Sequence, residues 1–179
     1  NHMAPLAKLM SQGLRKLTPI VHDSNAIVIF NNQIRTRPGV SFGNPEYQPG
    51  GRALPFYSSV RLDVRIAERF KDDDGVQLGH KVKITVKKNK VSAPHFTSFF
   101  NFYYRAGDHT GYGEVQPGVD IGDSYLELAL MLGMAKQVSS WFHFVDTSSG
   151  ESIAKWNGRY AATTGIMEYK EIIDKQIYR

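Results

Sequence analysis

One segment of the chain combines cations with apolar and aromatic side chains in a pattern that suits a charged ligand with flat surfaces. The cations flank the segment and the other side chains lie between them, in the order Arg35, Arg37, Pro38, Val40, Phe42, Tyr47 and Arg52. A single-stranded nucleic acid offers phosphates to arginines and exposed bases to flat or apolar side chains. The composition is therefore compatible with a nucleic-acid contact, but by itself it does not favour that role over a lid, a protein contact or a mobile surface loop.

A strand and a long loop are expected to position these side chains. The run Ala26–Phe30 is apolar, rich in β-branched residues and bounded by asparagines, which is typical of a strand buried on both faces. Residues 34–51 then contain repeated glycine and proline, which interrupt helices and strands. Loops longer than about 12–15 residues in a compact domain are usually functional or disordered. We therefore predict that residues 34–51 form a binding loop.

Periodicity predicts the other elements. An apolar stripe at helical spacing, with Pro5 in its first turn, predicts an amphipathic helix that packs on a sheet. Asp74-Gly75 between two strand patterns predicts a hairpin turn rather than a calcium loop, because the calcium-loop spacing is absent. The aromatic run after Phe96 favours a buried strand over a stacking platform. The predicted helices span 6–17, 51–58, 125–133 and 159–178, and the strands span 60–65, 81–91, 96–104 and 141–144.

Composition bounds the function only loosely. The chain has 179 residues, no cysteine and a formal net charge of +5, a mild preference for polyanions. Without cysteine there are no disulfides or thiolate metal sites, which is compatible with a cytoplasmic protein. No apolar run approaches the ~18–20 residues that a membrane span needs, so no membrane partner is expected. The six histidines are scattered without metal-ligand spacing, and we expect no metal site.

The central segment also resembles a known family. Gln33–Arg35, Gly39–Val40, Phe42–Glu46 and Gly50–Gly51 resemble the second DNA-binding loop of bacterial RecA recombinases. The resemblance begins at His2–Met3 and Met10–Gln12, continues through Ser59–Asp63 and Lys88–Lys90 to Ala93–Pro94, and thins after about Tyr104. It implies an α/β fold. Residues 1–108 would be part of a RecA-type ATPase core, with a mixed, mostly parallel sheet, helices and a β-hairpin extension. Residues 109–179 would form a small α/β carboxyl-terminal domain.

The resemblance assigns DNA-binding roles residue by residue. Phosphate contacts are implied for the loop arginines and the paired glycines, assisted by one face of the first helix, whereas Pro38, Val40 and Phe42 would wedge or space the bases. The DNA-binding positions are Met3, Lys8, Ser11, Arg15, Arg35, Arg37, Pro38, Gly39, Val40, Phe42, Gly50, Gly51 and Arg52. The expected partner is single-stranded DNA.

The resemblance also implies nucleotide and subunit contacts. Lys88 and Lys90 would reach the γ-phosphate of ATP held by a neighbouring subunit, where a cation supplied in trans stabilises developing charge. Gln33 would sense that γ-phosphate and pass its position to the loop. Three further positions match the family's nucleotide-binding and interface residues: Pro94 and Tyr104 beside the nucleotide, and Phe56 between neighbouring subunits. Self-association into a helical filament is therefore expected.

Two further DNA sites are implied. Arg65 and Lys83 match basic positions of a secondary site for double-stranded DNA or a displaced strand, although Thr85 replaces one of its lysines. A lysine row on a strand is otherwise an ordinary solvated face, which discourages aggregation at an edge. Lys155 and Arg159 lie near basic positions of the carboxyl-terminal domain that gather duplex DNA.

The sequence lacks a phosphate loop. It contains no Gly-Lys pair, and the family's catalytic glutamate and magnesium aspartate lie before the point at which this sequence begins. ATP and Mg²⁺ are thus expected in an intact family member, and no tightly bound cofactor is expected in this chain alone. Two hypotheses follow. Either the chain is part of an ATP-dependent recombinase that forms a filament on single-stranded DNA and promotes strand exchange, or it is a truncated, non-enzymatic DNA-binding or filament-modulating module.

Overall fold

The computed structural model describes residues 3–109 and 113–177, with the backbone only for residues 3 and 4. The chain divides into two compact units, and each is described here by itself. The first comprises residues 1–61 and 87–94, and the second comprises residues 62–86 and 95–179. Strands β3 (Val60–Lys71) and β4 (Gln77–Asn89) contribute residues to both units. The domain boundary expected at residue 108 stays a prediction.

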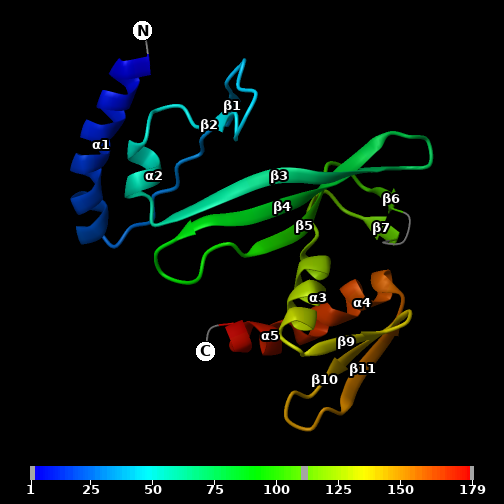
Figure 1. The fold of residues 1–179 in the computed structure, drawn as a ribbon. Coiled ribbons are helices and arrows are strands. Elements are labelled where there is room, and N and C mark those ends of the chain that lie inside the picture. The colour runs from blue at the N-terminus through cyan, green and yellow to red at the C-terminus, as the bar shows by residue number, and fades with distance from the viewer. Residues whose placement is uncertain (1–2, 110–112, 178–179) are drawn as a thin grey trace. The chain divides into compact units, whose positions relative to one another are not determined.

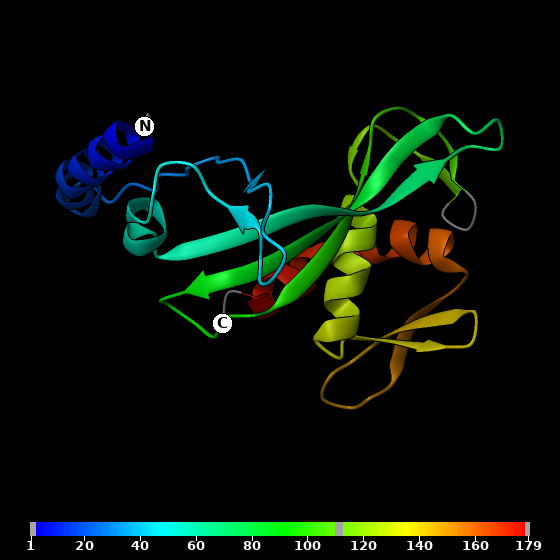
Figure 2. The ribbon, with the colours of Figure 1, turned by 45° about the horizontal axis from the view of Figure 1, so that its top comes forward.

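The first unit contains two helices and a small ladder. Helix α1 (Met3–Asp23) and helix α2 (Ala53–Tyr57) lie side by side (Figures 1 and 2, blue and cyan). Strands β1 (Arg35–Thr36) and β2 (Glu46–Tyr47) lie between the two helices in the sequence, and they pair with each other. Each helix contributes one buried leucine, Leu14 and Leu54 respectively. Both sequence-predicted helices are therefore confirmed.

Two packing expectations for this unit are wrong. Ala26–Phe30 forms no strand, and Ile27 and Ile29 are 90% and 87% exposed. A strand needs a neighbouring backbone to take its hydrogen bonds, and none of the described residues pairs with this run. Similarly, α1 packs against α2 rather than against a sheet, so Leu6 and Leu9 on its apolar stripe remain 44% and 65% exposed.

The second unit begins with a long hairpin. Strands β3 (Val60–Lys71) and β4 (Gln77–Asn89) are joined by the expected turn, in which the backbone N–H of Val76 donates to Asp72 Oδ1. Strand β5 (Thr97–Tyr103) and strand β8 (Gly118–Val119) complete a sheet of order β3-β4-β5-β8. Strands β6 (Gly107–His109) and β7 (Gly113–Val115) form a second, smaller hairpin. A small cluster is buried here, comprising Phe70, Leu78, Tyr103 and Val115.

The rest of the second unit packs helices on one face of a three-stranded sheet (Figure 1, yellow to red). Helix α3 (Ile121–Met131) precedes strands β9 (Ala135–Val138), β10 (Trp141–Val145) and β11 (Ser152–Asn157), ordered β11-β10-β9. Helix α4 (Arg159–Gly165), the 3-10 helix η1 (Ile166–Tyr169) and helix α5 (Lys170–Ile177) follow. The main core is formed by residues of α3, β9, β10, α4, η1 and α5 together with Met134: Leu126, Ala129, Met134, Ala135, Phe142, Phe144, Ala162, Ile166 and Ile173. Ala154 and Trp156 of β11 are partly buried and pack against it.

The predicted single terminal helix is broken at Gly165. A Cβ on this glycine would lie 2.1 Å from Trp156 Nε1, so the absence of a side chain allows the two elements to approach closely. The 3-10 turn that follows buries Ile166 completely.

The α/β class is confirmed, whereas the mostly parallel core sheet is not seen in the described part of the chain. The pairings β1–β2, β4–β5, β5–β8, β6–β7, β9–β10 and β10–β11 are all antiparallel. None of the helices described is long and apolar enough to cross a membrane.

Candidate nucleic-acid interface

The predicted binding loop is closed at its base by a short ladder. Arg35 pairs with Tyr47 and Thr36 with Glu46, and the backbone N–H of Arg37 donates to Pro45 O at 3.0 Å. The guanidinium carbon of Arg37 lies 5.0 Å from the centroid of the Tyr47 ring, a cation–π contact. The loop is therefore more ordered than its glycine and proline content predicts.

The side chains at the loop tip are open to solvent. Phe42 is 98% exposed and Val40 is 41% exposed, while Pro38 and Gly39 between the ladder and Val40 are also exposed. The Phe42 ring therefore buries almost no surface within the fold. Phe42 is thus available to contact a base.

The end of the loop closes onto α1 through two glycines. Gly51 has a φ of +75°, and a Cβ there would lie only 2.8 Å from Ala7 Cβ. Gly50 has a φ of +91°, and its Cβ would lie 3.3 Å from Met10 Cγ. A side chain at either position would be strained, because L-residues rarely adopt positive φ. Glycine is therefore required for this close approach.

That approach places residues from two predicted DNA-binding segments around one open hollow. Its lining residues are Ala7, Ser11, Arg52, Ala53, Phe56 and Tyr57. Lys8, Ser11 and Arg15 recur at helical spacing on one face of α1, and both basic side chains are exposed. The structure thus brings Ser11 and Arg52 to the same hollow, and their DNA-binding role stays a prediction. Met3 and His2 are outside the described side chains.

Lys88 is engaged within its own unit. Its Nζ donates to the carbonyls of Pro55 at 2.7 Å and Phe56 at 2.9 Å, in the last turn of α2. Desolvation lowers the Lys88 pKa, and repulsion from Lys90 and Arg61 lowers it further. A cation near the last carbonyls of a helix stabilises that end. Lys88 therefore supports α2, which carries the 72% exposed ring of Phe56.

We expect Lys88→Met to loosen the end of α2. The substitution removes the ammonium group that donates hydrogen bonds to the Pro55 and Phe56 carbonyls. Hydrogen exchange at the Phe56 and Ser58 amides, which donate to Arg52 O and Leu54 O, should become several-fold faster. Lys90→Met is the matched control, because it removes an exposed ammonium of the same charge. Equal acceleration in both variants would contradict the tether.

The other predicted nucleotide contacts lie on open surface. The backbone N–H of Gln33 donates to Asn32 Oδ1 at 2.9 Å, in an exposed segment before β1. Pro94 is exposed in the first unit. Tyr104 is 50% exposed in the second unit, and its hydroxyl shares a hydrogen bond of 2.7 Å with His80 Nδ1.

The predicted secondary DNA site consists of exposed residues on the hairpin. Arg65 Nε donates to Asp63 Oδ1 at 2.9 Å, which partly neutralises its charge. Lys83 is exposed opposite Phe99 on β5, and the Nζ of Lys81 lies 6.0 Å from the Phe99 ring. The DNA-binding role of Arg65 and Lys83 stays a prediction.

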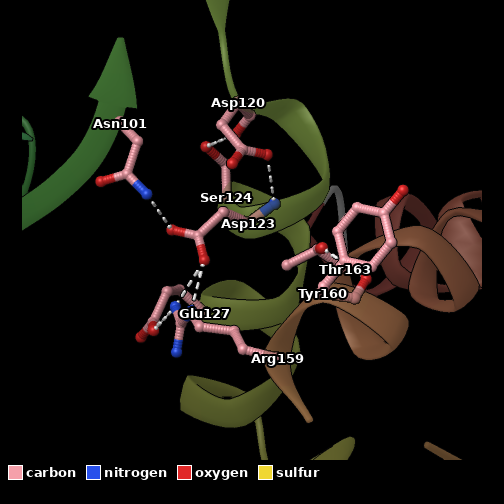
Figure 3. A network of polar contacts seen from close by, with 8 residues as sticks. All are labelled: Asn101, Asp120, Asp123, Ser124, Glu127, Arg159, Tyr160 and Thr163. Carbon is pink, nitrogen blue, oxygen red and sulfur yellow. Dashed lines mark hydrogen bonds and ion pairs between the residues drawn. The ribbon is translucent and has the colours of Figure 1, made fainter. Parts of the chain in front are cut away.

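Arg159 belongs to a polar network that joins β5, α3 and α4 (Figure 3). Its Nε donates to Asp123 Oδ1 at 2.7 Å, and its guanidinium also bonds Glu127. Asn101 Nδ2 donates to the other Asp123 oxygen at 3.1 Å. Burial raises the pKa of Asp123, and Arg159 partly offsets that increase. Although burial opposes its charge, Arg159 has a raised pKa because Glu127 and Asp123 bond it.

Sequence reasoning did not single out Asp123 or Asn101. Asp123 lies in the first turn of α3, where acidic residues are common because they favour the helix N-terminus, so nothing in the sequence indicated that it would be buried. The network engages the guanidinium of Arg159 within the chain, so its predicted contact with duplex DNA stays a prediction. Among residues 3–109 and 113–177, no group of three or more histidines and carboxylates could hold a metal ion.

Comparisons with known proteins agree with the family resemblance that the loop motif indicated. Residues 1–109 match a family model described as the RecA N-terminal domain. Protein RecA of Ruminococcus albus is 43% identical over 150 residues, which cover 84% of this chain and 35% of that protein. Protein RecA of Bacillus subtilis is 40% identical, with 97% of this chain and 44% of that protein covered. Protein RecA of Chlamydia caviae is 36% identical, with 99% and 47% covered. The chain thus spans less than half the length of these curated relatives.

Proposed function

This chain belongs to the RecA family, and we propose that it is the single-stranded-DNA-binding portion of a recombination and repair protein. The longer protein would form an ATP-dependent filament and promote strand exchange with double-stranded DNA. One observation carries the DNA-binding part. The glycine pair at the loop end seats the loop on α1, so that Ser11 and Arg52 share one hollow. The loop that leads there presents Arg37 and Phe42.

The loop suits unpaired DNA because it offers charge and an exposed ring together. Arg35 and Arg37 are exposed at the ladder, and Phe42 lies at the tip. Guanidinium groups bind phosphates, whereas an exposed ring gains contact area by stacking on a base. Double-stranded DNA keeps its bases stacked on one another, so it would contact the arginines through its phosphates but leave the Phe42 ring without a base to stack on.

The test is the salt dependence of binding by an Arg35→Ala/Arg37→Ala double variant. The logarithm of the binding constant falls linearly with the logarithm of the salt concentration. Each lost phosphate contact makes this slope shallower by about 0.7 on single strands, so the loss of two contacts makes it shallower by about 1.4. Anisotropy of a labelled oligo-dT should show lower affinity and this shallower slope. Arg69→Ala/Lys71→Ala is the control, since it removes two exposed charges of β3. A slope that stays unchanged in the arginine variant would contradict the proposal.

ATP and Mg²⁺ are proposed as cofactors of a longer family member only. Gln33, Lys88 and Lys90 supply an amide and two ammonium groups, which suit phosphate oxygens. They do not fit a complete nucleotide site, because the sequence contains no Gly-Lys pair and Lys88 is bonded to two carbonyls of α2. Lys88 would have to leave those carbonyls before it could reach a neighbour's nucleotide.

A second candidate function is modulation of another recombinase's filament. It is favoured by Phe56, which is 72% exposed and whose backbone carbonyl accepts a hydrogen bond from Lys88. If the chain caps a filament through Phe56, Lys88 and Lys90, adding it to an intact recombinase should slow ATP turnover in proportion to its concentration. Unchanged turnover at saturating amounts would remove this candidate.

A further inference from the structure

The two aromatic side chains of the binding loop lie in different surroundings. Phe42 at the tip is 98% exposed, whereas Tyr47 in β2 is only partly exposed. The composition of the loop makes both rings candidates for contacts with bases. In the structure, however, the guanidinium carbon of Arg37 lies over the Tyr47 ring, 5.0 Å from its centroid. The ring of Tyr47 therefore already has a partner within the loop.

Strand register explains why this contact forms. Arg35 on β1 is directly opposite Tyr47 on β2, so their side chains share one face of the ladder. Side chains alternate between the two faces of a strand, so Arg37 returns to the face of Arg35. A residue diagonally across an antiparallel pair is within reach of a long or aromatic side chain. One face of the ladder thus carries two arginines together with the ring.

Hydrogen bonds hold the ladder in place at both of its ends. Towards the tip, the backbone N–H of Arg37 donates to Pro45 O at 3.0 Å, and that of Glu46 donates to Asn44 Oδ1 at 3.0 Å. At the base, Asn32 Nδ2 donates to Pro49 O at 3.3 Å. All these contacts form within the chain itself. The Tyr47 ring consequently has a defined place from which it can act on Arg37.

A guanidinium group can use a ring and a phosphate together. It stacks on aromatic rings through its flat face, whereas its N–H donors lie in its plane and point outward. Contact with Tyr47 therefore leaves the N–H donors of Arg37 able to bind a phosphate. An exposed arginine otherwise loses side-chain freedom when it binds, and this loss weakens binding. A ring that restricts Arg37 in advance reduces that cost.

We propose that Tyr47 is a positioning residue for DNA binding and not a surface on which a base stacks. Its ring holds the Arg37 guanidinium on the face that also carries Arg35. Both cations are then directed at the phosphates of one strand before that strand binds. This inference rests on the proposed function, because it assumes that the loop contacts single-stranded DNA. It adds a residue outside the predicted DNA-binding positions.

A double-mutant cycle separates positioning from stacking. Tyr47→Thr removes the ring but keeps a β-branched residue that suits a strand. Affinity for a labelled oligo-dT should fall about two- to fivefold, the effect of one exposed cation–π contact. The same substitution should have no effect in an Arg37→Ala chain and its full effect in an Arg35→Ala chain. A loss that persists in Arg37→Ala would overturn the proposal, because the ring would then contact DNA itself.

The salt dependence of binding provides a second criterion. Arg37→Ala should make the slope shallower by about 0.7, because it removes one phosphate contact. Tyr47→Thr should leave the slope unchanged, since both arginines still reach phosphates. Tyr47→Phe keeps a ring and should retain most of the affinity. A slope that becomes as shallow in Tyr47→Thr as in Arg37→Ala would overturn the positioning role.

Nuclear magnetic resonance tests the contact without any DNA. The Tyr47 ring should shift the side-chain proton signals of Arg37 upfield in the free chain. The shift should persist in Tyr47→Phe and disappear in Tyr47→Thr. Equal Arg37 signals in all three proteins would overturn the proposal while leaving the proposed function intact. Failure of the proposed function would appear differently, as unchanged oligo-dT binding by Arg35→Ala/Arg37→Ala.

Discussion

Arg159→Met is expected to destabilise the second unit by about 3 kcal/mol, because breaking one side of a buried ion pair leaves an uncompensated charge. Asp123 is only 5% exposed, and Arg159 supplies the opposite charge that contacts it. After the substitution, Asn101 Nδ2 still donates to Asp123, but Glu127 adds a second negative charge nearby. Urea unfolding followed by circular dichroism measures the loss of stability.

The loss in Arg159→Met should depend on pH. Burial already raises the pKa of Asp123, and removing Arg159 takes away the charge that lowers it. An acid whose folded-state pKa exceeds its unfolded value loses stability as pH rises through the folded pKa. The destabilisation should therefore be small near about pH 4, close to the unfolded pKa of aspartate, and complete at about pH 8.

Two variants check the cause of this loss. Arg159→Lys keeps the charge but loses the forked geometry, so it should be destabilised less. Arg159→Met/Asp123→Asn removes both charges and should recover most of the stability at about pH 8, because no buried charge remains. A loss of the same size at both pH values, or no recovery in the double variant, would contradict this account of the network.

Gly51→Ala should lower affinity for single-stranded DNA about tenfold, because an alanine in left-handed conformation costs about 1–2 kcal/mol. Gly51 has a φ of +75°, and its Cβ would lie 2.8 Å from Ala7 Cβ and 3.5 Å from Ala7 Cα. Ala7 is part of a helix, so its atoms cannot rotate away. The end of the loop should therefore leave α1 and separate Arg52 from Ser11. Oligo-dT anisotropy measures the affinity.

Two glycines provide controls for Gly51→Ala. Gly43 has a φ of +86°, but a Cβ there would meet nothing within 4 Å, so Gly43→Ala tests backbone strain without a collision. Gly13 lies within α1 with nothing within 4 Å, so Gly13→Ala should stabilise that helix by up to about 1 kcal/mol. If Gly43→Ala weakens binding as much as Gly51→Ala, the contact with α1 is not what holds the site.

The local elements could be predicted from the sequence because their signals lie within each segment. Alternation of valine and lysine indicates β4, and Asp74-Gly75 indicates the turn before it. Glycine and proline indicate the binding loop, since both restrict the backbone locally. The motif around Arg35 also identified the family, because family membership is recorded in residue order.

Contacts between distant residues were decided by the tertiary structure alone. Ala26–Phe30 has the composition of a buried strand, yet burial depends on a neighbouring strand that the segment cannot specify. Arg159 reads as an exposed cation until α3 presents Asp123 to it. Lys136, His143 and Lys155 are neighbours only because strand register aligns β9, β10 and β11. The sequence by itself determined the β3–β4 hairpin, the first helix and the family to which the chain belongs. Only tertiary packing decided which charged side chains form ion pairs within the chain, because an ion pair depends on the distance between two residues in space and not on their separation in the sequence.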